Sequence, residues 1–363
     1  GMAATRLTAL ARARLRAIPA SAAAAATTVR FFSSQRNEVF DQKAKNAHRE
    51  RSALMYPDGR YDYLKDEVAR RLVDRLNDVS PAKKFPSALD LGSLHGSVRK
   101  GLAFTAQNKG IEKLHQLETC ERLLTRDKDV DDHPEGLDVT YDVWEEETRL
   151  PYDDQSFDVV FSSMSLHWVN DLPRVFQEVN RVLKPDGVFL GAMLGGETLQ
   201  ELRSSFAVAE QERHGGVSSH LSPFVRDSEI GGLIQGAGFN LPTADSDLLT
   251  VRYPDMFTLM EHLRGMAETN ATFIRKRYTS PEAFLAAASA YQELYSDQDG
   301  LLEATFHVIY LIGWKYHESQ QSPDERGSGN TRLSATLEEL AKGPLAMPGV
   351  GDDDHDGGGK KGE

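Results

Sequence analysis

Between residues 61 and 314, short apolar runs alternate along the chain with patterns typical of amphipathic helices. The clearest apolar runs cover residues 88–91 and 157–162. Further strands are expected at residues 113–118 and, more weakly, at 139–142. Strands that alternate with helices pack as a parallel sheet with helices on both faces. The pattern therefore predicts an α/β domain.

The remaining expected elements complete this domain. Helices are expected at residues 61–77, 98–107, 120–126, 172–183, 198–212 and 227–237. A fifth strand is expected at 188–193, and two more at 248–253 and 306–314, with helices at 256–266 and 281–295 between those two. These inserted helices would lie over the carboxyl edge of the sheet, the edge at which such folds bind ligands.

Both ends of the chain differ in composition from this middle part. Residues 1–36 contain no Asp or Glu and carry arginines spread among Ala, Ser, Thr and Leu, which is typical of a mitochondrial transit peptide. We interpret residues 37–60 as a linker and residues 61–318 as the folded domain. Residues 319–363 are polar, and such a composition cannot bury enough apolar surface to fold.

Overall composition narrows the class of partner. The 363 residues carry a formal net charge of −13, which argues against a nucleic-acid backbone as the main partner. A basic substrate, such as an arginine-bearing protein, suits this charge better. The single cysteine, Cys120, excludes disulfides within the chain and metal sites built on several thiolates, and we expect it to be a small buried hydrophobic residue. No apolar run approaches the roughly 20 residues of a membrane-spanning helix, so any membrane contact would be peripheral.

A glycine-containing loop follows the first expected strand. It runs from Asp90 to Gly96 with the sequence Asp-Leu-Gly-Ser-Leu-His-Gly. Backbone N–H groups of such a loop, with the N-terminus of the next helix, can hold a charged ligand. An acidic residue at the end of the next strand, here Glu118, can bind ribose hydroxyls. Glycine loops after strands occur in many folds, so this feature alone is not decisive.

Four further motifs follow the loop in a characteristic order: residues 150–152, 156–160, 165–168 and 183–187. With the loop, they resemble the class I S-adenosylmethionine (SAM)-dependent methyltransferases of the type 11 branch. The resemblance implies a Rossmann-like, seven-stranded sheet with SAM as cofactor. It also implies that Gly92 and Gly96 shape the loop, that Asp90 anchors the amino-acid end of SAM, that Glu118 binds the ribose and that Glu146 lies near the adenine.

Leu94 departs from the glycine pattern of that family, which has a glycine at this position. The glycine lets the backbone approach the ligand closely, and a Cβ there would intrude. A leucine side chain would project into the space of the cofactor or force a different path of the loop. The sequence therefore predicts weak SAM binding or none.

Longer segments carry a closer resemblance. Residues 63–68, 165–173, 191–199, 220–224 and 312–319 resemble the mitochondrial complex I assembly factors known as arginine hydroxylases. This resemblance implies a location in the mitochondrial matrix and is compatible with peripheral contact to the inner membrane. The implied activity is hydroxylation of an arginine in an iron–sulfur subunit of NADH:ubiquinone oxidoreductase (complex I). Two alternatives stay open: a SAM-dependent methyltransferase, and a non-catalytic assembly chaperone, which Leu94 favours over the methyltransferase.

Candidate catalytic residues follow the fourth and fifth strands. His167 and Trp168 could orient the substrate or stack on a guanidinium, or they could simply plug the end of a strand. Glu197 could meet a positive charge of the substrate or favour the N-terminus of the next helix. His220 lies in a serine-rich loop that could cover the pocket or be plain surface. The His-x-Glu spacing from His133 to Glu135 lies outside the shared motifs, so no metal site is predicted.

The acid-free leader leads to a prediction about processing. The mature protein should begin near Ser33, because an arginine at position 30 precedes that site at a spacing that resembles a processing signal. N-terminal sequencing of the protein isolated from mitochondria tests this. An intact N-terminus on a cytosolic protein would show that residues 1–36 are not a transit peptide.

Overall fold

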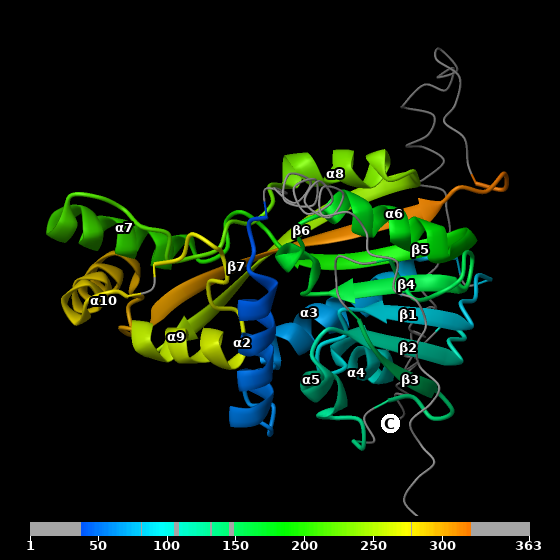
Figure 1. Ribbon diagram of the computed structural model, residues 1–363, viewed down its shortest axis with the longest axis horizontal. Coiled ribbons are helices and arrows are strands. Elements are labelled where there is room, and N and C mark those ends of the chain that lie inside the picture. Colours follow the sequence, from blue (N-terminus) through cyan, green and yellow to red (C-terminus); the bar gives the residue numbers. More distant parts are fainter. Residues whose placement is uncertain are drawn as a thin grey trace, which may run out of the picture. The chain divides into compact units, whose positions relative to one another are not determined.

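Figure 1 shows the computed structural model of the chain. It describes residues 38–320, except residues 81, 105–108, 131–132, 145–148 and 277. The predicted transit peptide and most of the polar tail lie outside these residues. Contacts divide the chain into two units, Gly1–Glu318 and Ser319–Glu363, and the fold described below is that of the first unit.

The described residues form a seven-stranded sheet with the order β3-β2-β1-β4-β5-β7-β6. Its strands are β1 Ser87–Leu91, β2 Lys113–Glu118, β3 Asp138–Val143, β4 Phe157–Ser163, β5 Leu183–Leu194, β6 Phe239–Tyr253 and β7 Leu302–Lys315. Strands β1 to β5 pair in parallel, whereas β7 is antiparallel to both β5 and β6. The predicted α/β class, with a Rossmann-like sheet of seven strands, is confirmed.

Helices cover both faces of this sheet. One face packs against α3 Tyr63–Asp74 and α4 Ser97–Phe104, and the other against α6 Leu172–Val182 and α8 Asp227–Gly236. Strand β4 shows why: Val159 and Phe161 belong to the first core cluster, and Val160, between them, belongs to the second. Successive side chains of a strand point to opposite faces, so an uninterrupted apolar run serves two cores.

Strands β6 and β7 are longer than the sequence predicted. Strand β7 pairs with β5 only from Val308 to Trp314, so its first residues continue past the carboxyl end of β5 and pair with β6 alone. The helices α7 Gln200–His214, α9 Met256–Gly265 and α10 Pro281–Tyr295 gather around this extension (Figure 1). Most side chains of β6 are exposed or half-buried, which is why an apolar pattern found only its last third.

The interpretation of residues 37–60 as a linker was wrong. The helix α2 occupies Gln42–Met55, and the Asp41 side chain caps its N-terminus by accepting a hydrogen bond from the Ala44 N–H. The buried positions of α2 lie on one face, but two of them carry charges: Lys45 and Arg49. An apolar periodicity could not reveal this helix, because its buried face is largely polar.

Close packing of α9 against Tyr61 leads to a prediction about stability. A Cβ added at Gly265 would lie 2.1 Å from the Cδ2 atom of Tyr61. Gly265→Ala should therefore lower the free energy of unfolding by about 1–3 kcal/mol, the usual cost of overpacking. Urea denaturation of the purified protein measures this change.

Gly231 in α8 provides the matched control. A Cβ there meets no heavy atom within 4 Å, so Gly231→Ala should be neutral or raise the free energy of unfolding by up to about 1 kcal/mol. Equal effects of the two substitutions would contradict the packing argument.

Candidate functional site

The glycine loop lies at the carboxyl end of β1, between β2 and β4. Gly92 and Gly96 have φ angles of +69° and +93°, a region that L-residues rarely adopt. A Cβ at Gly92 would lie 2.1 Å from the Ser165 Oγ atom. Both glycines are therefore required by the path of the loop and by the approach of neighbouring protein atoms.

The side chain of Leu94 lies in the protein core. Its φ is +56°, and its side chain is buried in the same core cluster as Val98 and Leu102 of α4. The Leu94 side chain therefore packs in the protein core, and the weak binding of SAM stays a prediction. The Leu94 N–H donates a hydrogen bond of 2.9 Å to Oε2 of Glu118, so the leucine backbone has a role in the loop that a side-chain argument could not show.

Glu118, the predicted ribose-binding acid, is fully buried at the end of β2 and bound by protein groups. Its Oε1 accepts hydrogen bonds from the N–H and the hydroxyl of Thr119, both at 2.9 Å, and from the Cys120 N–H at 3.3 Å. The Arg49 guanidinium of α2 lies 3.2 Å from the same oxygen. Burial alone would raise the pKa of Glu118, but Arg49 and the N–H donors outweigh burial and lower it.

Asp90 is also fully buried, but fewer protein groups bind its carboxylate than bind that of Glu118. Its Oδ2 accepts a hydrogen bond of 3.3 Å from Gln116, whereas its buried Oδ1 has no hydrogen-bond partner among the described residues. Burial raises the pKa of Asp90 to about 7. The free oxygen fits the predicted anchoring of an ammonium group.

As a whole, however, the loop does not fit SAM in this conformation. Residues 91–99 are all buried by protein, and the ribose acid is occupied by Arg49. The predicted adenine-side residue Glu146 lies outside the described residues. The candidate cofactor residues Asp90, Gly92, Gly96 and Glu118 do come together, but they form a cradle closed by α2.

A second buried group surrounds Glu268, in the loop after α9. Its Oε1 lies 3.3 Å from the Lys45 Nζ and 3.8 Å from the Lys65 Nζ. Its Oε2 accepts hydrogen bonds from His167 Nε2 at 3.0 Å and from Trp168 Nε1 at 2.8 Å. We call these five residues the Glu268 cluster. It brings His167 and Trp168 to the same carboxylate and includes an acid and two lysines that the sequence analysis missed.

The electrostatics of the Glu268 cluster are strongly perturbed. Burial lowers the pKa of Lys45 to about 7, although Glu268 opposes this shift. Burial would raise the pKa of Glu268, but Lys45, His167 and Lys65 hold it well below its usual value. Lys45 also lies 3.7 Å from the centroid of the Trp168 ring. Such clusters are costly to bury, and perturbed pKa values gather at functional sites.

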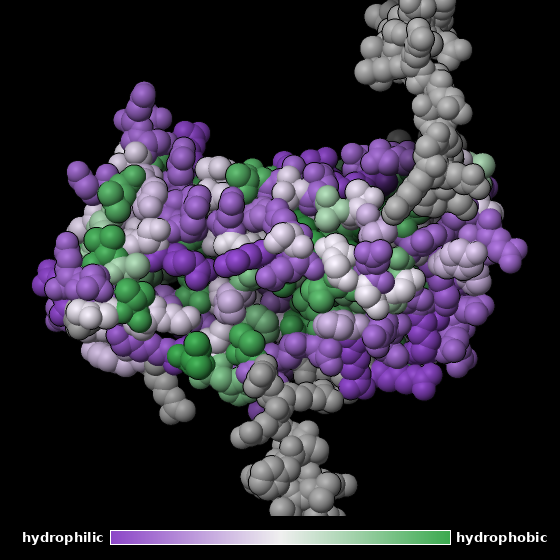
Figure 2. Space-filling model, turned by 90° about the horizontal axis from the view of Figure 1, so that it is seen from above, coloured by the Kyte–Doolittle hydropathy of each residue, from purple (hydrophilic) through white to green (hydrophobic). Residues whose placement is uncertain are grey.

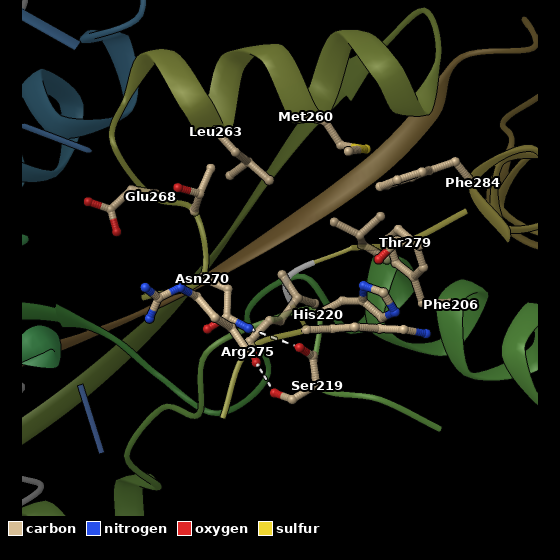
Figure 3. Close-up of a pocket in the computed structure, with 14 residues that line it drawn as sticks. Phe206, Ser219, His220, Met260, Leu263, Glu268, Asn270, Arg275, Thr279 and Phe284 are labelled. Atoms are coloured by element: carbon tan, nitrogen blue, oxygen red, sulfur yellow. Dashed lines mark hydrogen bonds between the residues drawn. The ribbon is translucent and has the colours of Figure 1, made fainter. Parts of the chain in front are cut away.

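A pocket of about 260 Å³ borders this cluster (Figure 3). Its wall is largely apolar and comes from α7, α9, α10 and neighbouring loops, and Glu268 lies on the same wall. The apolar lining residues are Leu202, Phe206, Leu221, Met260, Leu263 and Phe284. Asn270 and Ser219 also line it and are joined by a hydrogen bond of 3.0 Å from the Asn270 amide to the Ser219 carbonyl.

The two other candidate residues, His220 and Glu197, lie in different parts of the structure. His220 lines the pocket, where it stacks on Phe206 with ring centroids 4.1 Å apart and lies 2.9 Å from a Glu210 oxygen. Glu197 is exposed after β5 and does not line this pocket, whereas Glu268 does. A role for Glu197 in meeting the charge of the substrate stays a prediction. Within the described ranges, no group of three or more His, Cys, Asp or Glu residues is arranged to hold a metal ion.

Comparison with known proteins identifies the family. The sequence model of the methyltransferase-domain family matches residues 89–191. A mouse protein named "Arginine-hydroxylase NDUFAF5, mitochondrial" is 43% identical over 304 residues, which cover 84% of each chain. The chain belongs to the NDUFAF5 arginine-hydroxylase family. Its relatives are named mitochondrial, and this family member is a mitochondrial protein.

More distant matches are to methyltransferases. A malonyl-[acyl-carrier protein] O-methyltransferase of Methylovorus sp. is 31% identical over 269 residues, which cover 73% of this arginine-hydroxylase family member and 88% of the bacterial enzyme. The solved structure of YcgJ from Bacillus subtilis aligns at 15% identity with a TM-score of 0.45, covering 69% of this chain and 98% of YcgJ. The sequence matches agree with the sheet in showing that this family member has the methyltransferase fold.

The buried pairs of Glu268 lead to a prediction about pH. Glu268→Gln should lower the free energy of unfolding near pH 6 by about 3 kcal/mol, because it leaves Lys45 and Lys65 buried without a counter-charge. The folded-state pKa of Glu268 is depressed, so its contribution is present above its unfolded pKa of about 4.3 and is lost as the pH falls below that value. The difference between wild type and variant should therefore shrink from pH 6 towards pH 3.

Urea denaturation at several pH values measures this difference. Glu67→Gln is the control, since Glu67 is part of an exposed cluster with Arg70 and Arg71 and should cost less than about 1 kcal/mol. A Glu268→Gln effect that is small, or that is independent of pH, would show that the carboxylate is not held as a charged partner.

Proposed function

We propose that this protein hydroxylates an arginine of an iron–sulfur subunit of complex I in the mitochondrial matrix, during assembly of that complex. The observation that carries the proposal is the 43% identity, over 84% of both chains, to the mouse protein named arginine-hydroxylase. Hydroxylation replaces one C–H bond of the substrate by C–OH and leaves the guanidinium charge in place. It is a two-electron oxidation, so molecular oxygen or another two-electron oxidant must supply the oxygen atom.

The pocket beside the Glu268 cluster suits an arginine side chain. Arginine combines an apolar stem with a planar cation that pairs with carboxylates. Leu263 and Met260 offer apolar contact for the stem, and Glu268 offers a carboxylate on the same wall. Because the pKa of Lys45 is about 7, this lysine can give up its proton when a second cation approaches Glu268. His167 and Trp168 hold the other carboxylate oxygen in place.

Exposed apolar side chains near this pocket suit a protein substrate. Val208 on α7 and Leu285 and Leu294 on α10 are exposed, and Figure 2 shows hydrophobic patches at this end of the molecule. Patches of this kind commonly mark protein contacts.

Among the helices that the structure describes, none has the length and apolar character of a membrane-spanning helix.

A second candidate function is a non-catalytic assembly chaperone that uses the fold as a binding surface. The closed cradle favours it, since residues 91–99 are buried and Glu118 is already paired with Arg49. Methyl transfer from SAM would require the same cradle to open.

Mass spectrometry of complex I distinguishes these functions. Deletion of the gene should stall complex I assembly, and an arginine peptide of an iron–sulfur subunit should lose the mass of one oxygen atom. Rescue with the wild-type protein should restore both. A gain of one methylene in place of oxygen would indicate a methyltransferase, and stalled assembly with no mass change would indicate the chaperone.

Two variants connect this result to the site. His167→Gln should accumulate but fail to restore the modified arginine, because it disturbs the hydrogen bonds that hold Glu268. His115→Gln on β2 is the control, since His115 contacts Thr140 and lies outside the Glu268 cluster. Normal complex I assembly in the deletion strain would overturn the assignment to this pathway.

A further inference from the structure

Helix α2 inserts two cations into two different buried sites. Lys45 and Arg49 are four residues apart on its buried face, and each is 1% exposed. Lys45 pairs with Glu268 beside the pocket, whereas Arg49 pairs with Glu118 in the glycine-loop cradle. One rigid element therefore closes both places at once.

Arg49 stands where a ribose would have to bind. A ribose diol donates its hydroxyls to the acid at the end of the second strand of such folds. In this chain Glu118 Oε2 accepts from the Leu94 N–H, and Oε1 accepts from Thr119 and Cys120 and pairs with Arg49. A ribose can reach this carboxylate only if the guanidinium leaves it.

The other contacts of α2 lie on two sides of the helix, one towards the pocket and one towards the cradle. On one side, Lys45 donates to the Ala267 carbonyl at 2.8 Å, in the loop after α9, and Ser52 donates to the carbonyl of Gly265, the last residue of α9. On the other side, besides Arg49, the Asn46 side-chain oxygen of α2 accepts a hydrogen bond of 2.8 Å from the Thr119 hydroxyl. An exposed ion pair also joins Glu50 of α2 to Arg122 of α5 (Glu121–Thr125) at 2.9 Å. Exposed pairs of this kind contribute little to stability.

We infer that α2 is a lid on the cradle, and that Arg49 competes with the ribose of a nucleoside-containing ligand for Glu118. The ligand class is set by the chemistry of the cradle. Glu118 is an acid for a diol, and a buried carboxyl oxygen of Asp90 that has no partner among the described residues suits an ammonium group. A ligand that binds only the open state has its apparent affinity reduced by the fraction of molecules that are open. This inference does not depend on hydroxylation of arginine.

Calorimetric titration of the full-length protein with SAM tests the lid. Arg49→Met removes the competing guanidinium and keeps an apolar side chain of similar length, so SAM should bind at least about tenfold more tightly than to wild type. Arg122→Met breaks the other α2 ion pair without touching Glu118, and its affinity should stay within about twofold of wild type.

Hydrogen exchange of the wild-type protein gives a second readout that needs no variant to fold. Saturating SAM should increase amide exchange in residues 42–55, because the lid must leave the cradle. Weaker binding by Arg49→Met, or greater protection of α2 when SAM is bound, would overturn the inference and make Arg49 a ligand of the cofactor. Absence of SAM binding by every form would overturn it as well.

Discussion

Two buried carboxylates, Glu118 and Glu268, can remain charged in this fold only because cations are buried with them. Removing an ion from water costs several kcal/mol even after relaxation, and the cost is recovered only with a well-placed partner and further hydrogen bonds. Arg49 provides that partner for Glu118, and Lys45 and Lys65 provide it for Glu268. Two of these three cations come from α2, a helix that precedes the sheet in the sequence. The sheet alone would expose both acids, so α2 is part of the domain.

The same charges explain why the site is assembled from distant segments. Glu118 ends β2, His167 follows β4, Glu268 follows α9, and the lysines come from α2 and α3. Parallel strands bring their carboxyl ends to one edge, which places Glu118 and His167 at the same side of the sheet. The loop after α9 then brings Glu268 to that edge, and α2 lies over both Glu118 and Glu268.

Much of this fold could be predicted from the sequence, and the failures have a common physical cause. Strand β2 and helix α10 were predicted at their observed bounds. For α10, the proline at the helix start reports local structure directly. Helix α2 was missed because its buried face carries charges, and most of β6 because its side chains are largely exposed. A pattern of apolar residues records only burial that is driven by apolar side chains.

The residues of the site were likewise predicted only in part. His167 and Trp168 were found because they directly follow a strand within a recognisable motif, and the structure brings both to Glu268. Glu268 itself has no local pattern, since its partners lie about 100 or more residues away in the sequence. Glu197 was chosen for its place after a strand, but proximity to the correct edge does not decide whether a side chain points inward. Leu94 was judged by its side chain alone, whereas the backbone turned that side chain into the core.

The spacing of Lys45 and Arg49 on α2 links the cradle around Glu118 to the pocket beside Glu268. Four residues of α-helix span about 6 Å, and a helix moves as a rigid rod over that length. Displacing Arg49 from Glu118 together with α2 must also move Lys45 away from Glu268. Occupation of the cradle would then change the charge that the pocket presents to a cation, and a cation bound at Glu268 would in turn favour release of α2. Coupling of this kind is reciprocal by thermodynamic necessity, so a ligand at either acid must alter affinity at the other.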